Sequence, residues 1–239
     1  MSPVRRSTGF TLIELMLAMT FISILLIAIA MTTIQISSIY NKGITLREVN
    51  QAGRSLSDEF QRSIANSVPF DVTPKIDNSP ATATSKYVVR DGGGRLCLGD
   101  YTYAWNYGAS IAGETSAPPI FNKYNDGGVV RFAKVPDSSG SLCADPTISI
   151  PRSGSVDLLS RGDRDLAVHV LTVQKTASDA GNDQALYAIS FTLGTNDQAQ
   201  LTANDASCRP PSENVGDEDY CSVNQFDVIA RAGNTAGGQ

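Results

Sequence analysis

Few residues of this 239-residue chain are of a type that could support catalysis. His169 is the only histidine, so a Ser-His-Asp or Cys-His mechanism would have to use it, and a zinc site would have no second imidazole. The alternation of side chains along a strand places His169 on one face with three apolar residues, Ala167, Leu171 and Val173. We therefore predict a structural histidine, no catalytic residues, no metal or cofactor site, and a protein that is not an enzyme.

The four cysteines are Cys97, Cys143, Cys208 and Cys221. An even number favours disulfides in an oxidising, extracytoplasmic compartment over a thiolate nucleophile or a metal site. Four cysteines permit three connectivities, and proximity in the sequence favours Cys97 with Cys143 and Cys208 with Cys221.

Two polar segments could bind a ligand. The loop between the last two cysteines carries four carboxylates: Glu213, Asp217, Glu218 and Asp219. Clustered carboxylates can hold calcium, but the regular spacing of an EF-hand loop is absent, which favours a solvated acidic loop. Residues 161–163 read Arg-Gly-Asp, the tripeptide that integrin ligands display, although a glycine-containing polar triplet is more often a turn.

The segments that carry these residues differ sharply in composition. Hydrophobic residues make up 41% of the chain and charged residues 18%, which excludes a disordered or multispanning protein. Yet 22 of the 31 residues from 10 to 40 are apolar. Residues 41–239 hold 17 basic and 23 acidic side chains, so we expect no general binding to nucleic acids.

The apolar segment can span a membrane. Residues 15–41 contain no charge, and a helix rising ~1.5 Å per residue would cover the ~30 Å hydrocarbon core. Arg5 and Arg6 precede it, which predicts a cytoplasmic N-terminus and an exported C-terminal part. A secretory signal cleaved at the small residues 28–30 and an uncleaved signal anchor both fit. Neither explains Glu14, because a carboxylate at the start of an apolar run is costly without a partner.

A third interpretation accounts for Glu14. Residues 9–14 read Gly-Phe-Thr-Leu-Ile-Glu, after a short basic leader and before about twenty apolar residues. This pattern resembles the class III signal of type IV prepilins and pseudopilins. The resemblance implies a leader of residues 1–9, cleavage between Gly9 and Phe10 by a membrane-embedded prepilin peptidase, and N-methylation of Phe10. It also implies that Glu14 pairs with the Phe10 amine of a neighbouring subunit and sets the register of packed helices.

Residues 10–40 and 41–68 are expected to form one long helix from about Thr11 to Ser67. In the second segment apolar residues recur at spacings of three and four: Val49, Ala52, Leu56, Phe60 and Ile64. The first half would therefore lie in the membrane or in a filament core, and the second half on the body of the protein. Gly43 and Gly53 would weaken this helix, and Pro69 would end it.

Residues 69–239 are predicted to form one extracytoplasmic, β-rich head. Strand-like runs lie at residues 87–90, 95–98, 101–107, 129–135, 166–174 and 185–193. The glycines of residues 91–94 favour a hairpin turn over a phosphate-binding loop. One strand face would carry Tyr101, Tyr103, Trp105 and Tyr107. That face could bind glycans or a partner, but a core position packed against Phe60 is favoured.

The predicted fold class is α+β, a long N-terminal helix packed on an antiparallel β-sheet head with a disulfide-bounded C-terminal region. The Cys208–Cys221 loop resembles the corresponding region of many type IV pilins. The length of the chain, its four cysteines and the helical segment of residues 49–62 resemble those of the PilW-like minor pilins and of the minor pseudopilins of type II secretion.

The expected function is that of a minor type IV pilin, which primes or joins a filament. The partners that this implies are the prepilin peptidase, other pilin subunits, the pilus assembly platform and, before assembly, membrane lipid. A minor pseudopilin is the nearest alternative. A signal-anchored surface binding module or adhesin comes from a different class, and an exported hydrolase is the third alternative.

Overall fold

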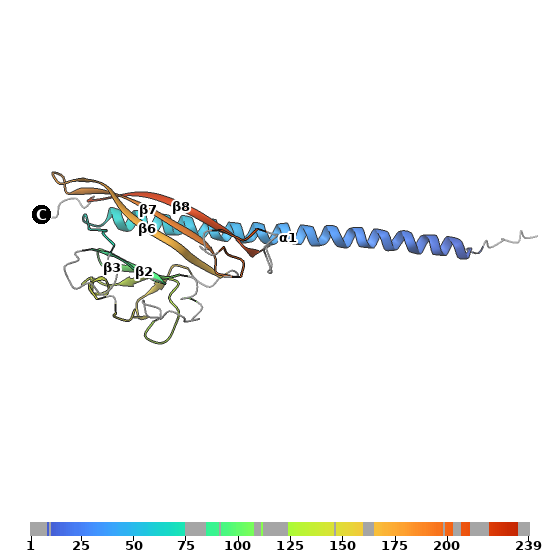
Figure 1. Ribbon diagram of the computed structural model, residues 1–239, viewed down its shortest axis with the longest axis horizontal. Coiled ribbons are helices and arrows are strands. Elements are labelled where there is room, and N and C mark those ends of the chain that lie inside the picture. The colour runs from blue at the N-terminus through green and yellow to red at the C-terminus, as the bar shows by residue number, and fades with distance from the viewer. Residues whose placement is uncertain are drawn as a thin grey trace, which may run out of the picture.

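One continuous helix, α1 (Leu12–Ala65), runs from the N-terminal part of the chain into the head of the protein. In the computed structural model its first half extends far beyond the head (Figure 1). It starts after the N-cap Thr11 and ends at the C-cap Asn66, so the helix predicted from about Thr11 to Ser67 is confirmed. The structure describes residues 9, 11–74, 85–90, 92–107, 111, 124–145, 147–159, 165–197, 199–202, 207–210 and 220–233.

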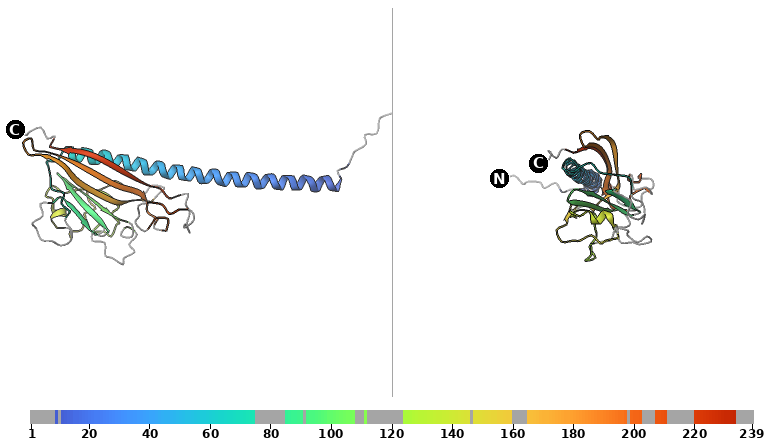
Figure 2. Two further views of the ribbon diagram at one scale, coloured as in Figure 1. Left: turned by 45° about the horizontal axis from the view of Figure 1, so that its top comes forward. Right: turned by 90° about the vertical axis from the view of Figure 1, so that its left-hand side faces the viewer.

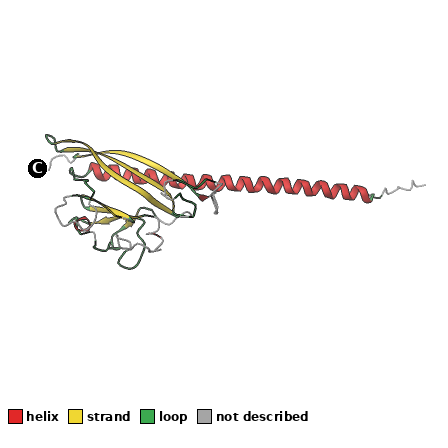
Figure 3. Cartoon of the chain, in the orientation of Figure 1, coloured by secondary structure: helices red, strands yellow, loops and turns green. Residues whose placement is uncertain are grey.

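Two antiparallel sheets make up the described part of the head, with strand orders β1-β2-β3-β4-β5 and β6-β7-β8. The strands of the first are β1 (Tyr87–Arg90), β2 (Gly93–Leu98), β3 (Tyr101–Asn106), β4 (Phe132–Pro136) and β5 (Val156–Asp157). Those of the second are β6 (Leu166–Asp179), β7 (Gln184–Thr195) and β8 (Val223–Ala232). A short helix, α3 (Ser141–Ala144), precedes β5 in the chain. The long strands of the second sheet lie along the second half of α1 (Figure 3).

The second half of α1 packs against both sheets, as the view along its axis shows (Figure 2, right). The Phe60 ring lies 5.6 Å from Tyr103 of β3, 5.8 Å from Phe132 of β4 and 5.9 Å from Phe191 of β7, measured between ring centroids. The apolar stripe predicted from the sequence faces this core. Its buried members, each at most 2% exposed, are Val49, Leu56, Phe60 and Ile64.

The six predicted strands are confirmed with somewhat different ends, but the expectation of one sheet is wrong because the strands divide between two. Three short or weakly patterned elements were not predicted: α3, β5 and β8. In β8, Val228, Ala230 and Ala232 are buried in the core and Phe226 packs against it. The alternation is present, but Asn224, Asp227 and the two alanines are of types that are depleted in strands, so the strand signal is weak.

The predicted hairpin turn is confirmed in part. Arg90 pairs with Gly93 across the turn, and Gly92 has a φ of 94°, a left-handed conformation that favours glycine. Gly93 and Gly94 lie within β2 instead. Gly94 is covered by the Trp105 indole, which leaves no room for a side chain.

Gly53 has a packing role that the sequence did not reveal. The Phe226 ring of β8 lies directly over it, so a Cβ added at Gly53 would overlap the ring. The ring is itself stacked on Phe191 at 5.2 Å. Gly53 was expected to weaken the helix, but its missing side chain allows β8 to approach α1 closely.

Gly53→Ala should therefore lower the stability of the head by about 1–3 kcal/mol, because the Phe226 ring must move. Denaturant unfolding of the full chain in detergent micelles measures this. Gly43→Ala is the matched control, since a Cβ there meets nothing within 4 Å. It should leave head stability unchanged and favour the helix by up to about 1 kcal/mol. Equal losses in the two variants would contradict the close approach of β8.

Candidate functional site

The first half of α1 is an uncovered apolar surface. No residue from 12 to 44 is buried, and Thr45 is the first buried residue of the helix. Leu12 is 77% exposed, Phe21 64% and Ile34 70%. The helix is long and apolar enough to cross a membrane. A soluble monomer rarely exposes an apolar patch beyond a few hundred Å², so this half requires lipid or other apolar helices around it.

Several hydroxyls in this half bond back to the helix itself. Thr20 donates to the carbonyl of Leu17 at 2.9 Å, and Ser23 donates to that of Met19 at 2.8 Å. Thr33 donates to the carbonyl of Ile29 at 2.8 Å. These three hydroxyls therefore need no outside partner in a medium that offers no hydrogen bonds.

Glu14 closes a capping box with Thr11 at the start of α1. Glu14 Oε2 accepts hydrogen bonds from the backbone N–H and the hydroxyl of Thr11, each at 2.9 Å. In return, Thr11 Oγ1 accepts from the Glu14 N–H at 3.3 Å. Glu14 Oε1 accepts no hydrogen bond from the described residues. The carboxylate therefore stabilises its own helix start and keeps one oxygen available.

The capping box was missed in the sequence, although residues 11–14, Thr-Leu-Ile-Glu, carry its pattern of a threonine followed three residues later by a glutamate. It gives Glu14 a local role under every interpretation of the apolar segment, so its presence alone does not select among them. Gly9, before the expected cleavage point, is exposed and has nothing within 4 Å of an added Cβ. Phe10, the expected N-methylation site, lies outside the described residues, as do residues 1–8.

His169 is buried, with 6% of its surface exposed, and its Nε2 lies 3.1 Å from the Thr195 carbonyl oxygen. This position agrees with a structural histidine. The predicted grouping on the strand face is wrong, however. The register of β6 with β7 shifts between Val168 and Val170, and this bulge at His169 puts Val168 in the core with Leu171 and Val173.

The aromatic face of β3 lies mainly in the core. Tyr103 and Trp105 have no exposed surface, whereas Tyr107 is half-buried and Tyr101 is 42% exposed. The packing of Tyr103 against Phe60 confirms the favoured interpretation for the two central residues.

A polar cluster that the sequence did not reveal fixes α1 to the first sheet. Glu59 Oε1 accepts hydrogen bonds from Tyr103 Oη at 2.6 Å and from Lys134 Nζ at 2.7 Å. Ser63 also bonds the Tyr103 hydroxyl. Burial acts to raise the pKa of Glu59, but these hydrogen bonds and the charges of Lys134 and Arg62 lower it below its ordinary value. Burial and the adjacent carboxylate raise the pKa of Tyr103.

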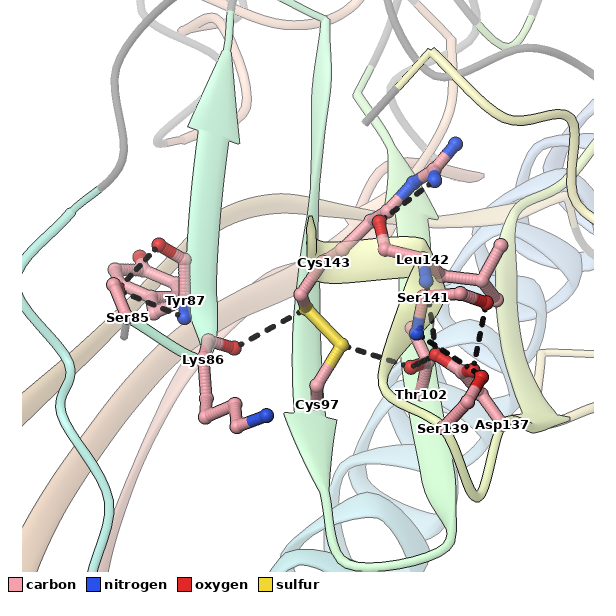
Figure 4. The surroundings of a disulfide bond; sticks show 11 residues. Ser85, Lys86, Tyr87, Cys97, Thr102, Asp137, Ser139, Ser141, Leu142 and Cys143 are labelled. Carbon is pink, nitrogen blue, oxygen red and sulfur yellow. Dashed lines mark hydrogen bonds between the residues drawn. A yellow bond between two sulfur atoms is a disulfide. The ribbon is translucent and has the colours of Figure 1, made fainter. Parts of the chain in front are cut away.

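Both disulfides favoured by sequence proximity are confirmed, Cys97–Cys143 and Cys208–Cys221. The first joins β2 to α3, next to the Asp137 carboxylate (Figure 4). Asp137 accepts hydrogen bonds from the Thr102 hydroxyl at 2.9 Å and from the Leu142 N–H at 3.0 Å. The disulfide and this carboxylate together hold α3 on the sheet.

Both candidate ligand segments, residues 161–163 and the acidic cluster of residues 213–219, lie outside the described residues.

No protein-family model, no curated protein and no solved structure matches this chain. The class that the fold defines is an α+β protein in which one helix, able to cross a membrane, carries an antiparallel β head with two disulfides.

The Glu59 cluster predicts a specific acid dependence of stability. Because the pKa of Glu59 is lowered on folding, its contribution is present above the unfolded pKa of ~4.3 and is lost as the pH falls through the folded value. Glu59→Gln should cost about 2 kcal/mol at pH 7 and flatten the fall in stability below about pH 4.3. Denaturant unfolding between about pH 2.5 and about pH 7 measures both effects. Lys134→Met should likewise flatten the acid limb, and an unchanged limb in both variants would contradict the assignment.

Proposed function

We propose that this chain is a minor type IV pilin, a subunit that is processed by a prepilin peptidase and then primes or joins a filament. The observation that carries the proposal is the continuity of α1. One helix runs from the Gly-Phe-Thr-Leu-Ile-Glu segment through an uncovered apolar half to the core of the head. Such a helix suits a subunit that first lies in lipid and then exchanges lipid for other apolar helices.

In the proposed mechanism, cleavage between Gly9 and Phe10 removes both arginines of the leader and creates a new α-amino group. With an ordinary pKa of ~7.7–8.0, that amine is a cation at the end of an apolar helix. Glu14 is an anion about one turn along. Its Oε2 remains in the capping box with Thr11, and Oε1 is available for the amine of an adjacent subunit. This charge-assisted contact would set the axial register between subunits.

The head has a different role in this mechanism. Phe60, Glu59 and the close contact at Gly53 join the head firmly to the second half of α1. Once the register of the first half is set, the position of the head on the filament surface follows. The protein would act by helix packing and contacts between heads, with no chemical step of its own.

The structure weakens the argument for two alternatives, a surface binding module and an exported hydrolase. A surface binding module was suggested by the aromatic strand, whose central residues Tyr103 and Trp105 are fully buried. A hydrolase would have to use His169, which is buried beside a backbone carbonyl. A minor pseudopilin uses the same helix and processing, and no observation here favours it over a pilin.

The N-terminus of the protein isolated from membranes tests the processing step. Intact mass and N-terminal sequencing should show a chain that begins at N-methylated Phe10. A start at Met1 would support an uncleaved anchor, whereas a start at Met31 would mean ordinary signal cleavage and would contradict the proposal.

Two substitutions separate the local role of Glu14 from the proposed intersubunit role. Glu14→Gln keeps a side chain that can complete the capping box but removes the charge, whereas Glu14→Ala removes both. If charge pairing drives assembly, both variants should be cleaved normally at Gly9 and both should be depleted from filaments, by about tenfold or more for a lost contact of ~1.4 kcal/mol. Quantitative immunoblots of sheared filaments measure this. Normal incorporation of Glu14→Gln would show that Glu14 acts only as a helix cap.

A further inference from the structure

A groove of about 930 Å³ lies beside β6, which is an edge strand of the second sheet and the strand of that sheet nearest to the first sheet (Figure 1). Ligand-binding clefts commonly have volumes of ~300–1,000 Å³. The groove is lined by residues 71–74, by residues 169–175 of β6, and by Tyr87, Val89 and Tyr107. The proposed function assigns no role to this groove.

The free edge of β6 directs backbone groups into the groove. Tyr87 Oη donates a hydrogen bond to the Leu171 carbonyl oxygen at 2.7 Å, so this carbonyl points away from β7. Alternate residues of a strand direct their backbone groups to the same edge, and the register with β7 is regular over residues 170–175. Val173 and Lys175 therefore face the groove as well. The Val173 carbonyl and the Lys175 N–H have no hydrogen-bond partner among the described residues.

The groove is bounded on its other side by residues 71–74. Phe70, directly before them, stacks on Tyr187 of β7 with ring centroids 4.2 Å apart, and Tyr187 is the register partner of Lys175. This segment therefore stays close to the second sheet while it lines the groove. A folded sheet from another molecule cannot pair with an edge that is bounded in this way, whereas a single extended chain can.

The charges of the groove are not balanced. Asp71 and Lys175 are the charged residues among the described lining. Asp71 Oδ1 accepts hydrogen bonds from the N–H and the hydroxyl of Thr73, at 2.9 and 2.8 Å. Lys175 is exposed, and its ammonium makes no ion pair with the described residues. A ligand with a carboxylate near Lys175 would therefore complement the charge of the groove.

We propose that this groove binds an extended segment of another protein, which adds to the edge of β6 as a further strand. The backbone of the segment pairs with Val173 and Lys175. Its alternate side chains are apolar and pack against Val72 and Val89, and one carboxylate pairs with the Lys175 ammonium. The inference goes beyond the proposed function and does not depend on it.

The same edge also has features that discourage pairing. Lysines and β-bulges blunt the exposed edges of sheets, and the register of β6 shifts between Val168 and Val170 and again between Lys175 and Ala177. Between these bulges, however, residues 170–175 form a regular stretch of roughly 20 Å. A peptide site must therefore be distinguished by experiment from an edge that is only protected.

A synthetic panel of hexapeptides, acetylated and amidated at their ends, is the probe for the full chain in detergent micelles. Each peptide has Val, Ile, Leu, Phe or Tyr at alternate positions, threonine between them, and one aspartate at either end. Fluorescence polarisation should show that the best members bind with a Kd on the order of 10 µM. Their counterparts with lysine in place of aspartate should bind at least about tenfold more weakly.

N-methylation of the best peptide tests backbone pairing on the unaltered chain. Only alternate N–H groups of an added strand face β6. Methylation of that set should weaken binding at least about tenfold, and methylation of the other set should weaken it less.

Lys175→Glu tests the charge of the groove. It should weaken the binding of the aspartate peptides at least about tenfold and strengthen that of the lysine peptides. Arg231→Glu is the matched control, because Arg231 is an exposed cation on β8 that does not line the groove. This control should bind both sets of peptides like the unaltered chain.

Three results would each overturn the inference. They are a panel in which no peptide binds more tightly than about 1 mM, equal weakening by the two sets of N-methyl groups, and unchanged affinities in Lys175→Glu. In any of these cases β6 accepts no strand, and its lysine and bulges only protect the edge. The proposed function would be unaffected, because it rests on the first half of α1. Conversely, a chain that binds the aspartate peptides but is absent from filaments would refute the proposed function alone.

Discussion

The structure depends on one constraint: a single unbroken helix must be stable both outside the head, where its apolar surface is uncovered, and inside the head, where one face packs against two sheets. Between its first and last turns, the backbone hydrogen bonds of α1 are internal to the helix, so it can leave the head without exposing unpaired peptide groups along its length. From Leu15 to Asn41 it carries no charge, and the hydroxyls of Thr20 and Thr33 bond back to the helix. From Thr45 onward one face is buried against two sheets, with Phe60 at their junction. Movement of either half is therefore transmitted to the other.

Two sets of contacts fix the head to α1, and they depend on different physical interactions. At Gly53 and Phe226 the contact is steric, because only a residue without a Cβ lets β8 lie this close to α1. At Glu59 the contact is electrostatic, because Lys134 and Tyr103 stabilise a half-buried carboxylate. The first is insensitive to pH and the second is lost in acid. Together they hold the head at one angle to the helix.

Much of this fold could be predicted because the responsible patterns are local. The apolar stripe through Phe60 has a helical period, and the strands of the head are bounded by turn residues. Each disulfide joins two cysteines that follow one another in the order of cysteines along the chain. What could not be predicted depends on distant partners. Glu59 and Lys134 are 75 residues apart, and nothing near Gly53 indicates that Phe226 will cover it. The bulge at His169 shifted a strand face by one residue, which no alternation pattern could reveal. The capping box of Thr11 and Glu14 was local and could have been found.

We propose that the uncovered half of α1 ends up surrounded by other apolar helices. Filaments sheared from cells and washed free of membrane test it most directly, because a chain with this exposed surface stays in aqueous solution without detergent only if other subunits cover it. Mass spectrometry of that fraction should detect this chain, including its apolar helix, at a constant ratio to the other filament subunits. If instead the chain is found only in the membrane fraction and is released only by detergent, it is an anchored membrane protein and the account is wrong.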